Sequence, residues 1–276
     1  MSEPSVEAQL RKLQARRSEL PLQSLFLPPA QRIEVALWYA LQDEIEEACF
    51  ELSEPFIAQT KLAWWAEELA RGCAGQGRHP LVQALFGQEP VDASDQSALW
   101  RALPEAALHL VERDLAPASV AEALASLQPL AAALDALERS LFGGATASGL
   151  IAVDLLLRRQ QRAEAGHFAQ ARLPRNLLAR HGLAPAHFAE RERLPARLAF
   201  VRDLAGELRA ALPVVAEPLA RPRALQIAVA QWRLARLSRE GRVPAPRGFP
   251  LMFSLWRAAR HSAPMPVPAS SGGALE

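Results

Sequence analysis

Cysteine is scarce in this 276-residue chain, which contains only Cys49 and Cys73. Two cysteines this far apart can neither build a disulfide framework nor supply the closely spaced ligand pair of a structural metal site. Their scarcity favours a reducing compartment. We therefore expect both thiols to serve as packing residues in the core.

Long apolar runs are also lacking. Residues 1–17 carry charges throughout and contain no apolar segment of the kind that a secretory signal requires. Uncharged stretches such as 140–153 contain glycines and fall short of the ~20 apolar residues of a membrane span. We expect a cytoplasmic protein with no transmembrane segment, for which any membrane contact is peripheral, at the inner face of the membrane.

Neither positive nor negative charge dominates, because the chain has 31 basic and 30 acidic residues and a formal net charge of +1. A field this weak does not attract nucleic acid by charge alone, so no nucleic-acid partner is expected. Glycine numbers only 14, Tyr39 is the sole tyrosine, and Lys12 and Lys61 are the only lysines. Alanine and leucine dominate instead, which favours helices.

Apolar residues recur at helical spacing, with proline and glycine between the segments, and no run alternates as a strand does. The sequence therefore predicts an all-α protein. Helices are expected over residues 5–17, 29–51, 54–71, 80–86, 96–114, 118–142, 147–162, 174–181, 196–212, 222–239 and 250–260. Ser53 is expected to cap the third of these, and Gly72 and Gly87 to end helices.

No fixed repeat or composition shift divides the chain, so we expect one helical domain over residues 1–261, with its core at about 28–260. Residues 262–276 are rich in Pro, Ser, Ala and Gly and have no core-forming pattern. They are expected to form a disordered C-terminal tail.

An acidic cluster falls late in the second expected helix. Because positions four apart share a helix face, Asp43, Glu47 and Glu51 are expected to align, with Glu44 and Glu46 beside them. Carboxylates at this spacing can hold Mg²⁺ on a diphosphate, since hard cations prefer oxygen ligands. The commoner interpretation of such a cluster is a solvated helix face.

Two adjacent tryptophans, Trp64 and Trp65, point about 100° apart on a helix, so each needs an apolar neighbour or a ligand. The simpler interpretation gives one to the core and the other to a seam between helices. Glu67 and Arg71 are spaced to form an ordinary surface ion pair.

A second candidate helix carries Arg158, Arg159 and Arg162 after Asp154. Arginine forks could bind a diphosphate or an acidic partner, whereas the commoner interpretation is again a solvated face. The six histidines show no metal-ligand spacing, and neither a glycine-rich phosphate loop nor a nucleophile elbow occurs. Hydrolase and nucleotide-binding functions therefore have no support.

Several motifs resemble those of the squalene/phytoene synthase family in order and spacing. They comprise ALWYAL at 36–41, RLP at 172–174 with LLARHGL at 177–183, and a block with "SEP", "WW" and "HP" elements. The residues of this signature block are Ser53, Glu54, Pro55, Lys61, Trp64, Trp65, Glu67, His79 and Pro80.

The resemblance implies an all-helical isoprenoid synthase fold around a central cavity. For active members it also implies Mg²⁺-dependent, head-to-head joining of two prenyl diphosphates in isoprenoid biosynthesis. Those members use two aspartate-rich motifs on facing helices. The ungapped alignment places Glu46, Glu47 and Phe50 at the first motif, so its last ligand position is apolar.

The second aspartate-rich motif falls at residues 158–163, where the chain has arginines and glutamines and no carboxylate. Without both carboxylate sets, the metal ions that must neutralise two diphosphates lack ligands. The sequence looks more like the divergent branch similar to a complex I assembly factor, which lacks the aspartate motifs.

Two functional hypotheses follow. The first is a catalytically inactive, synthase-like pseudoenzyme without a cofactor, which binds a protein partner or an isoprenoid or other apolar ligand. In it, Arg158, Arg159 and Arg162 would contact a diphosphate or a partner. The second is an atypical Mg²⁺-dependent prenyl diphosphate transferase that uses the degenerate first motif, Asp43, Glu46, Glu47 and Glu51.

Overall fold

The computed structural model describes residues 5–87, 94–113, 115–167, 172–188, 190–241, 246 and 248–266. All regular elements in these ranges are helices, which confirms the predicted all-α fold class. The α-helices are α1 (Val6–Arg16), α2 (Leu20–Ser24), α3 (Arg32–Phe50), α4 (Pro55–Cys73), α5 (Pro80–Phe86), α6 (Ser94–Glu112), α7 (Val120–Phe142), α8 (Ser148–Glu164), α9 (Arg175–Arg180), α10 (Leu194–Ala210), α11 (Arg221–Glu240) and α12 (Phe249–Arg260).

The expected helices lie within a few residues of the observed ones, and the short α2 was not expected. Two details differ. Ser53 does not cap α4, because Glu54 occupies the N-cap position and Pro55 sets the first turn. Gly72 lies inside α4, whereas Gly87, at φ 69°, ends α5 as expected.

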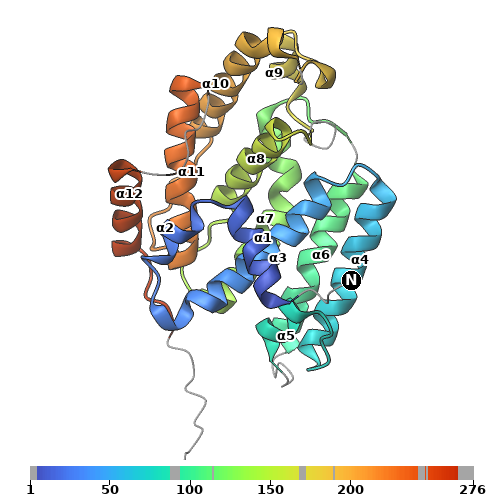
Figure 1. Ribbon diagram of the computed structural model, residues 1–276, viewed down its shortest axis with the longest axis vertical. Coiled ribbons are helices and arrows are strands. Elements are labelled where there is room, and N and C mark those ends of the chain that lie inside the picture. The colour runs from blue at the N-terminus through green and yellow to red at the C-terminus, as the bar shows by residue number, and fades with distance from the viewer. Residues whose placement is uncertain are drawn as a thin grey trace, which may run out of the picture.

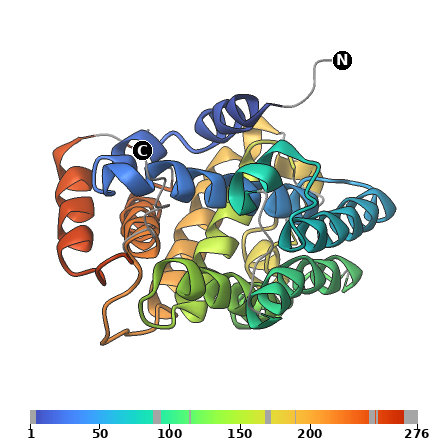
Figure 2. The same cartoon turned by 90° about the horizontal axis from the view of Figure 1, so that it is seen from below.

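The helices form two groups around α3, which runs through the middle of the molecule (Figure 1). On one side α4 packs on α6, and α6 on α7; on the other, α10 packs on α11, and α11 on α12. Helix α7 also packs on α8 and so joins the groups, while α1 lies on α3 and α5 (Figures 1 and 2). This arrangement places α3 opposite α8, with α1 across both.

The turn between α7 and α8 fixes how these two core helices meet. Gly143 ends α7 at φ 73°, and Gly144 follows at φ 87°. A Cβ on Gly144 would lie 2.1 Å from the backbone nitrogen of Ala220, so only glycine fits this close approach to the chain before α11. The buried Asp135 accepts hydrogen bonds from Thr146 and from the backbone of Ala147, which orders the start of α8.

Large side chains fill the core beneath α3 and α8, among them Trp38, Tyr39, Phe50 and Phe142. Cys49 and Cys73 are buried and free, which confirms their predicted role in packing. Burial raises the pKa of the Cys49 thiol to about 12, so this thiol stays protonated and unreactive at neutral pH.

Among the described helices, α7 alone is long and apolar enough to cross a membrane by length and composition. It is a central packing helix, however, and its buried Asp135 and Glu138 are hydrogen-bonded within the protein.

Part of the predicted C-terminal tail is described. Ala263 donates a backbone hydrogen bond to Leu219, and the carbonyl of Pro266 accepts one from Gln31. Residues 262–266 therefore run back along the molecule. The remainder of the tail, 267–276, lies outside the described residues.

Candidate functional site

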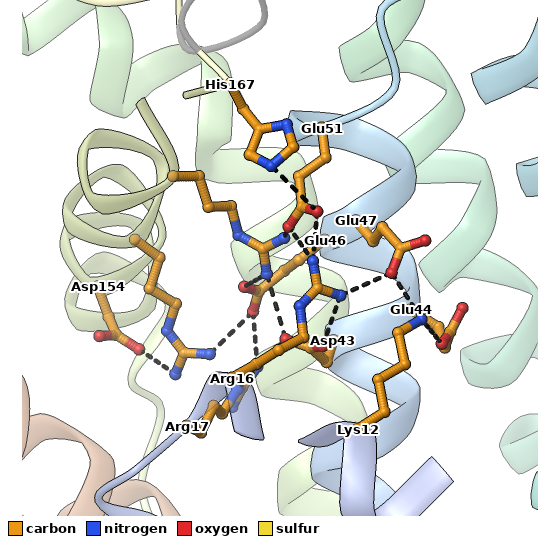
Figure 3. A network of polar contacts seen from close by, with 12 residues as sticks. Lys12, Arg16, Arg17, Asp43, Glu44, Glu46, Glu47, Glu51, Asp154 and His167 are labelled. Carbon is orange, nitrogen blue, oxygen red and sulfur yellow. Dashed lines mark hydrogen bonds and ion pairs between the residues drawn. The ribbon is translucent and has the colours of Figure 1, made fainter. Parts of the chain in front are cut away.

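The acidic side of α3 faces α8. The prediction that the charged faces of these two helices are exposed to solvent is therefore wrong. Asp43, Glu44 and Glu46 are each less than a tenth exposed, although Glu44 reaches α1 and α4 instead of α8. On α8, Asp154, Arg158 and Arg162 follow one another at four-residue intervals and form one stripe toward α3. Figure 3 shows Asp154 on α8 and Asp43 and Glu46 on α3, with cationic side chains between them.

Glu46 is the centre of the contacts. Its carboxylate accepts hydrogen bonds from Arg158 at 3.0 Å, Arg162 at 3.1 Å and Arg17, just after α1, at 3.2 Å. Burial raises the pKa of Glu46, but the positive charges of Arg158, Arg17 and Arg162 outweigh it and lower that pKa to about 2. Glu46 is therefore ionised at neutral pH and surrounded by guanidinium groups.

The outer carboxylates, Glu44 and Glu47, lie between two lysines. Lys12 from α1 contacts Glu44 at 2.6 Å and Glu47 at 2.7 Å, and Lys61 from α4 contacts both at 2.9 Å. Partial burial raises the pKa of Glu47, but hydrogen bonds from Lys12 and Lys61 dominate and lower it to about 2. The only two lysines of the chain thus bind the same pair of acids.

Two arginines bridge the remaining acids. Arg16 of α1 contacts Asp43 at 3.0 Å and also binds Glu47 and Glu51. Arg162 contacts Asp43 at 3.2 Å and also binds Glu51. The α1 arginine and the α8 arginine therefore bind the same two acids of α3, Asp43 and Glu51.

Together these side chains form what we call the ion-pair network. Its six carboxylates and six cations are Asp43, Glu44, Glu46, Glu47, Glu51 and Asp154, and Lys12, Arg16, Arg17, Lys61, Arg158 and Arg162. Six charges of each sign cancel, so the network has no net formal charge. The like-charge repulsion expected of the α3 acids is compensated inside the protein.

A cavity of about 280 Å³ opens beside the network and is lined by Arg16, Arg17, Asp43, Glu46 and Arg162, among others. Pockets for a single drug-sized ligand commonly measure about 300–1,000 Å³ and are mostly apolar. This cavity is at the lower limit of that range, and charged side chains line it. A wider hollow of about 1000 Å³ lies elsewhere, between α11 and α12.

Arg159 and Phe50 belong to the core and do not join the network. The Arg159 guanidinium lies 4.6 Å from the Phe50 ring centroid, and the side chain is 1% exposed. Burial, reinforced by the charge of Arg172, lowers the pKa of Arg159 to about 10. The structure therefore places Arg158 and Arg162 at the candidate site but separates Arg159 from it.

The signature block forms a joint between α4 and α5. Trp65 is buried and Trp64 is 40% exposed, and both rings meet the His79 ring, with centroids 5.1 and 5.7 Å away. His79 caps α5 by accepting a hydrogen bond from the backbone of Leu81, and Pro80 begins that helix. The tryptophans thus serve packing, as the simpler interpretation expected.

Other members of the block have different surroundings. Ser53 and Glu54 are exposed, and Glu67 forms the expected surface pair with Arg71 at 3.0 Å. Lys61 alone among these residues reaches the ion-pair network.

Sequence reasoning missed Glu68, the neighbour of Glu67. It is fully buried and accepts backbone hydrogen bonds from Arg78 at 2.5 Å and His79 at 2.6 Å. The position of Glu68 in the sequence could have indicated its burial. It lies three residues after the buried Trp65 and six after the buried Leu62, on the core face of α4. An acid on a core face needs internal donors.

Glu138 of α7 was also missed. It is 2% exposed and accepts hydrogen bonds from Trp38 and Gln42 at 2.8 Å and from Arg223 at 2.6 Å. It lies among buried leucines, so the same signal was available. Because Arg223 is also 3.9 Å from Asp154, this pair adjoins the ion-pair network.

Comparison with known protein families gives one match. The family model for squalene/phytoene synthase matches residues 13–125, which contain α3, the signature block and the start of α7. Over this region the chain is similar to the squalene/phytoene synthase family. Neither the curated proteins nor the solved structures that were searched gave a match.

The Mg²⁺ implied by this family does not fit the residues present. Within the described ranges, no group of three or more His, Cys, Asp or Glu side chains is placed to hold a metal ion. The α3 carboxylates bind lysines and arginines, and the one acid of the α8 stripe, Asp154, binds Arg158 at 2.7 Å. A metal ion would first have to displace these cations.

Proposed function

We propose that this protein is a non-catalytic member of the squalene/phytoene synthase family that acts as an interaction or assembly module. The proposal rests on one observation: lysine and arginine side chains of the protein form ion pairs with the carboxylates of α3. Guanidinium and ammonium groups take the place that metal ions would need. The network therefore stabilises the contact between α1, α3 and α8 and leaves the acids without a free ligand set.

The shape of the interior also favours an interaction module over a carrier of apolar ligands. Beneath the network the core contains fully buried aromatic side chains, such as Phe50 and Phe142. The cavity at the network is polar, and an apolar cavity beside α1 and α2 measures only about 210 Å³. The described residues at this site leave no apolar space of the size of two prenyl chains, which favours a function at the outer surface.

Turnover is the direct test. We expect no diphosphate release and no condensed isoprenoid when the purified protein is incubated with farnesyl or geranylgeranyl diphosphate and Mg²⁺. Glu46→Ala removes an acid of the network, and Glu67→Ala, which removes an exposed acid, serves as its control. Turnover that is lost in Glu46→Ala and kept in Glu67→Ala would overturn the proposal.

The second candidate function, an atypical Mg²⁺-dependent prenyl transferase, is supported by the cavity beside Asp43, Glu46 and Glu51. It requires the α1 cations to withdraw. A diphosphate that binds the native state must raise its thermal stability by mass action. The transferase therefore predicts a Mg²⁺-dependent rise in melting temperature with prenyl diphosphate, whereas the non-catalytic module predicts none.

A further inference from the structure

The outer side of α12 exposes aromatic side chains in an unusual number. Phe249, Phe253 and Trp256 are 81%, 51% and 43% exposed. Their spacing of four and three residues puts them on one face of the helix. Leu251 and Leu255 are fully buried on the opposite side, where α12 packs on α11. Both long sides of this helix are therefore apolar, and among the described residues only one of them packs against another helix.

The segment that carries this aromatic face has basic residues and no acidic ones. Between Gly241 and Leu275 the sequence contains four arginines, at positions 242, 247, 257 and 260, and no acidic residue. Arg257 and Arg260 belong to the last turn of α12, and the Arg260 guanidinium lies 5.1 Å from the Trp256 ring centroid. The whole chain has a net charge of only +1, so this segment is distinctly more positive than the rest of the sequence.

We propose that the face formed by Phe249, Phe253, Trp256 and Arg260 docks on the surface of an anionic lipid bilayer. Aromatic rings enter the boundary between headgroups and acyl chains, and arginines beside them bind anionic headgroups. A helix of 12 residues spans about 18 Å, so it would lie along the membrane and not cross it. The site lies outside the ion-pair network and does not depend on whether the interior is catalytic.

A second copy of the chain suits this face less well. A symmetric contact through α12 would bring the same patch of both subunits together. Arg257 and Arg260 of each would then face positive charge, because α12 carries no acid. Anionic lipid complements this charge.

Vesicle flotation tests the proposal. The full-length protein is expected to bind vesicles of phosphatidylcholine and phosphatidylglycerol at two to one, and to bind pure phosphatidylcholine vesicles far more weakly. Raising the salt to about 1 M, where charges act over only ~3 Å, should release it. Arg257→Gln with Arg260→Gln should weaken binding about 30-fold, and Phe253→Ser with Trp256→Ser about tenfold or more.

Phe56→Ser is the matched control. Phe56 is 78% exposed, close to the value for Phe249, but it lies on α4, on the opposite side of the molecule from α12 (Figure 1). This variant should bind vesicles as the wild type does. Circular dichroism establishes that each variant is folded.

Three results would overturn the proposal. They are failure of the wild type to bind anionic vesicles, binding that the α12 variants leave unchanged, and equal binding to neutral and anionic vesicles. A concentration-dependent dimer that these variants abolish would assign the face to a second copy instead.

Discussion

The ion-pair network and the outer face of α12 differ in whether their side chains have partners within the protein. In the network, carboxylates on α3 find cations on α1, α4 and α8, although the chain segments are far apart. On α12, three large aromatic rings stand open to solvent. The difference teaches that the charges of the ion-pair network are matched within the protein, whereas the apolar face of α12 is exposed. We therefore look for function at the surface.

The strongest way to break the interior is to remove Glu138. Glu138→Ala leaves the buried Arg223 without its carboxylate and removes the acceptor of Trp38 and Gln42. Loss of one partner from a buried pair costs about 3–5 kcal/mol. Urea denaturation should show this fall in the free energy of unfolding. Glu67→Ala, at an exposed pair, should cost less than about 1 kcal/mol, and equal losses in the two variants would contradict the assignment.

Acid should weaken the network next. Glu46 and Glu47 have pKa values lowered from 4.5 to about 2 in the folded protein. Their contribution to stability is therefore fully present above pH 4.5 and is lost as the pH falls toward 2. Melting temperatures measured across this range should fall, and Glu46→Gln should flatten the slope. A slope that the substitution leaves unchanged would show that Glu46 does not carry it.

The smallest effect is expected on α12. Phe253→Ser and Trp256→Ser remove exposed side chains, so each should change the free energy of unfolding by no more than about 0.5 kcal/mol. The same urea titration measures this. Losses of 2 kcal/mol or more would mean that the rings belong to the core, and the contrast with the network would disappear.

The sequence predicted most of the fold because helix periodicity is local. The expected ranges fall close to α1, α3, α4 and α7. Helix α2 was missed because it is only five residues long. Too few apolar positions fit in such a helix to show a period.

The candidate site was predicted only in part. Sequence patterns selected the acids of α3 and the arginines of α8, but not their pairing, because Arg158 and Glu46 are 112 positions apart. Lys12, Arg16 and Arg17 were missed for the same reason. A charge on an isolated helix is expected to face water, and here the neighbouring helices supply the opposite charge. Burial of a charge therefore depends on tertiary contacts that local patterns do not contain.

The stability of Glu46→Gln with and without Mg²⁺ tests the central claim, that the α3 carboxylates are partners of internal cations and not metal ligands. In a cluster of unpaired acids, removing one relieves repulsion and stabilises the protein without metal. In the ion-pair network, removing Glu46 takes the carboxylate from Arg17, Arg158 and Arg162. We predict a loss of about 3 kcal/mol in the free energy of unfolding, with no effect of Mg²⁺ on either protein. A Glu46→Gln variant that is more stable than the wild type, together with a Mg²⁺-dependent stabilisation seen only in the wild type, would contradict the account.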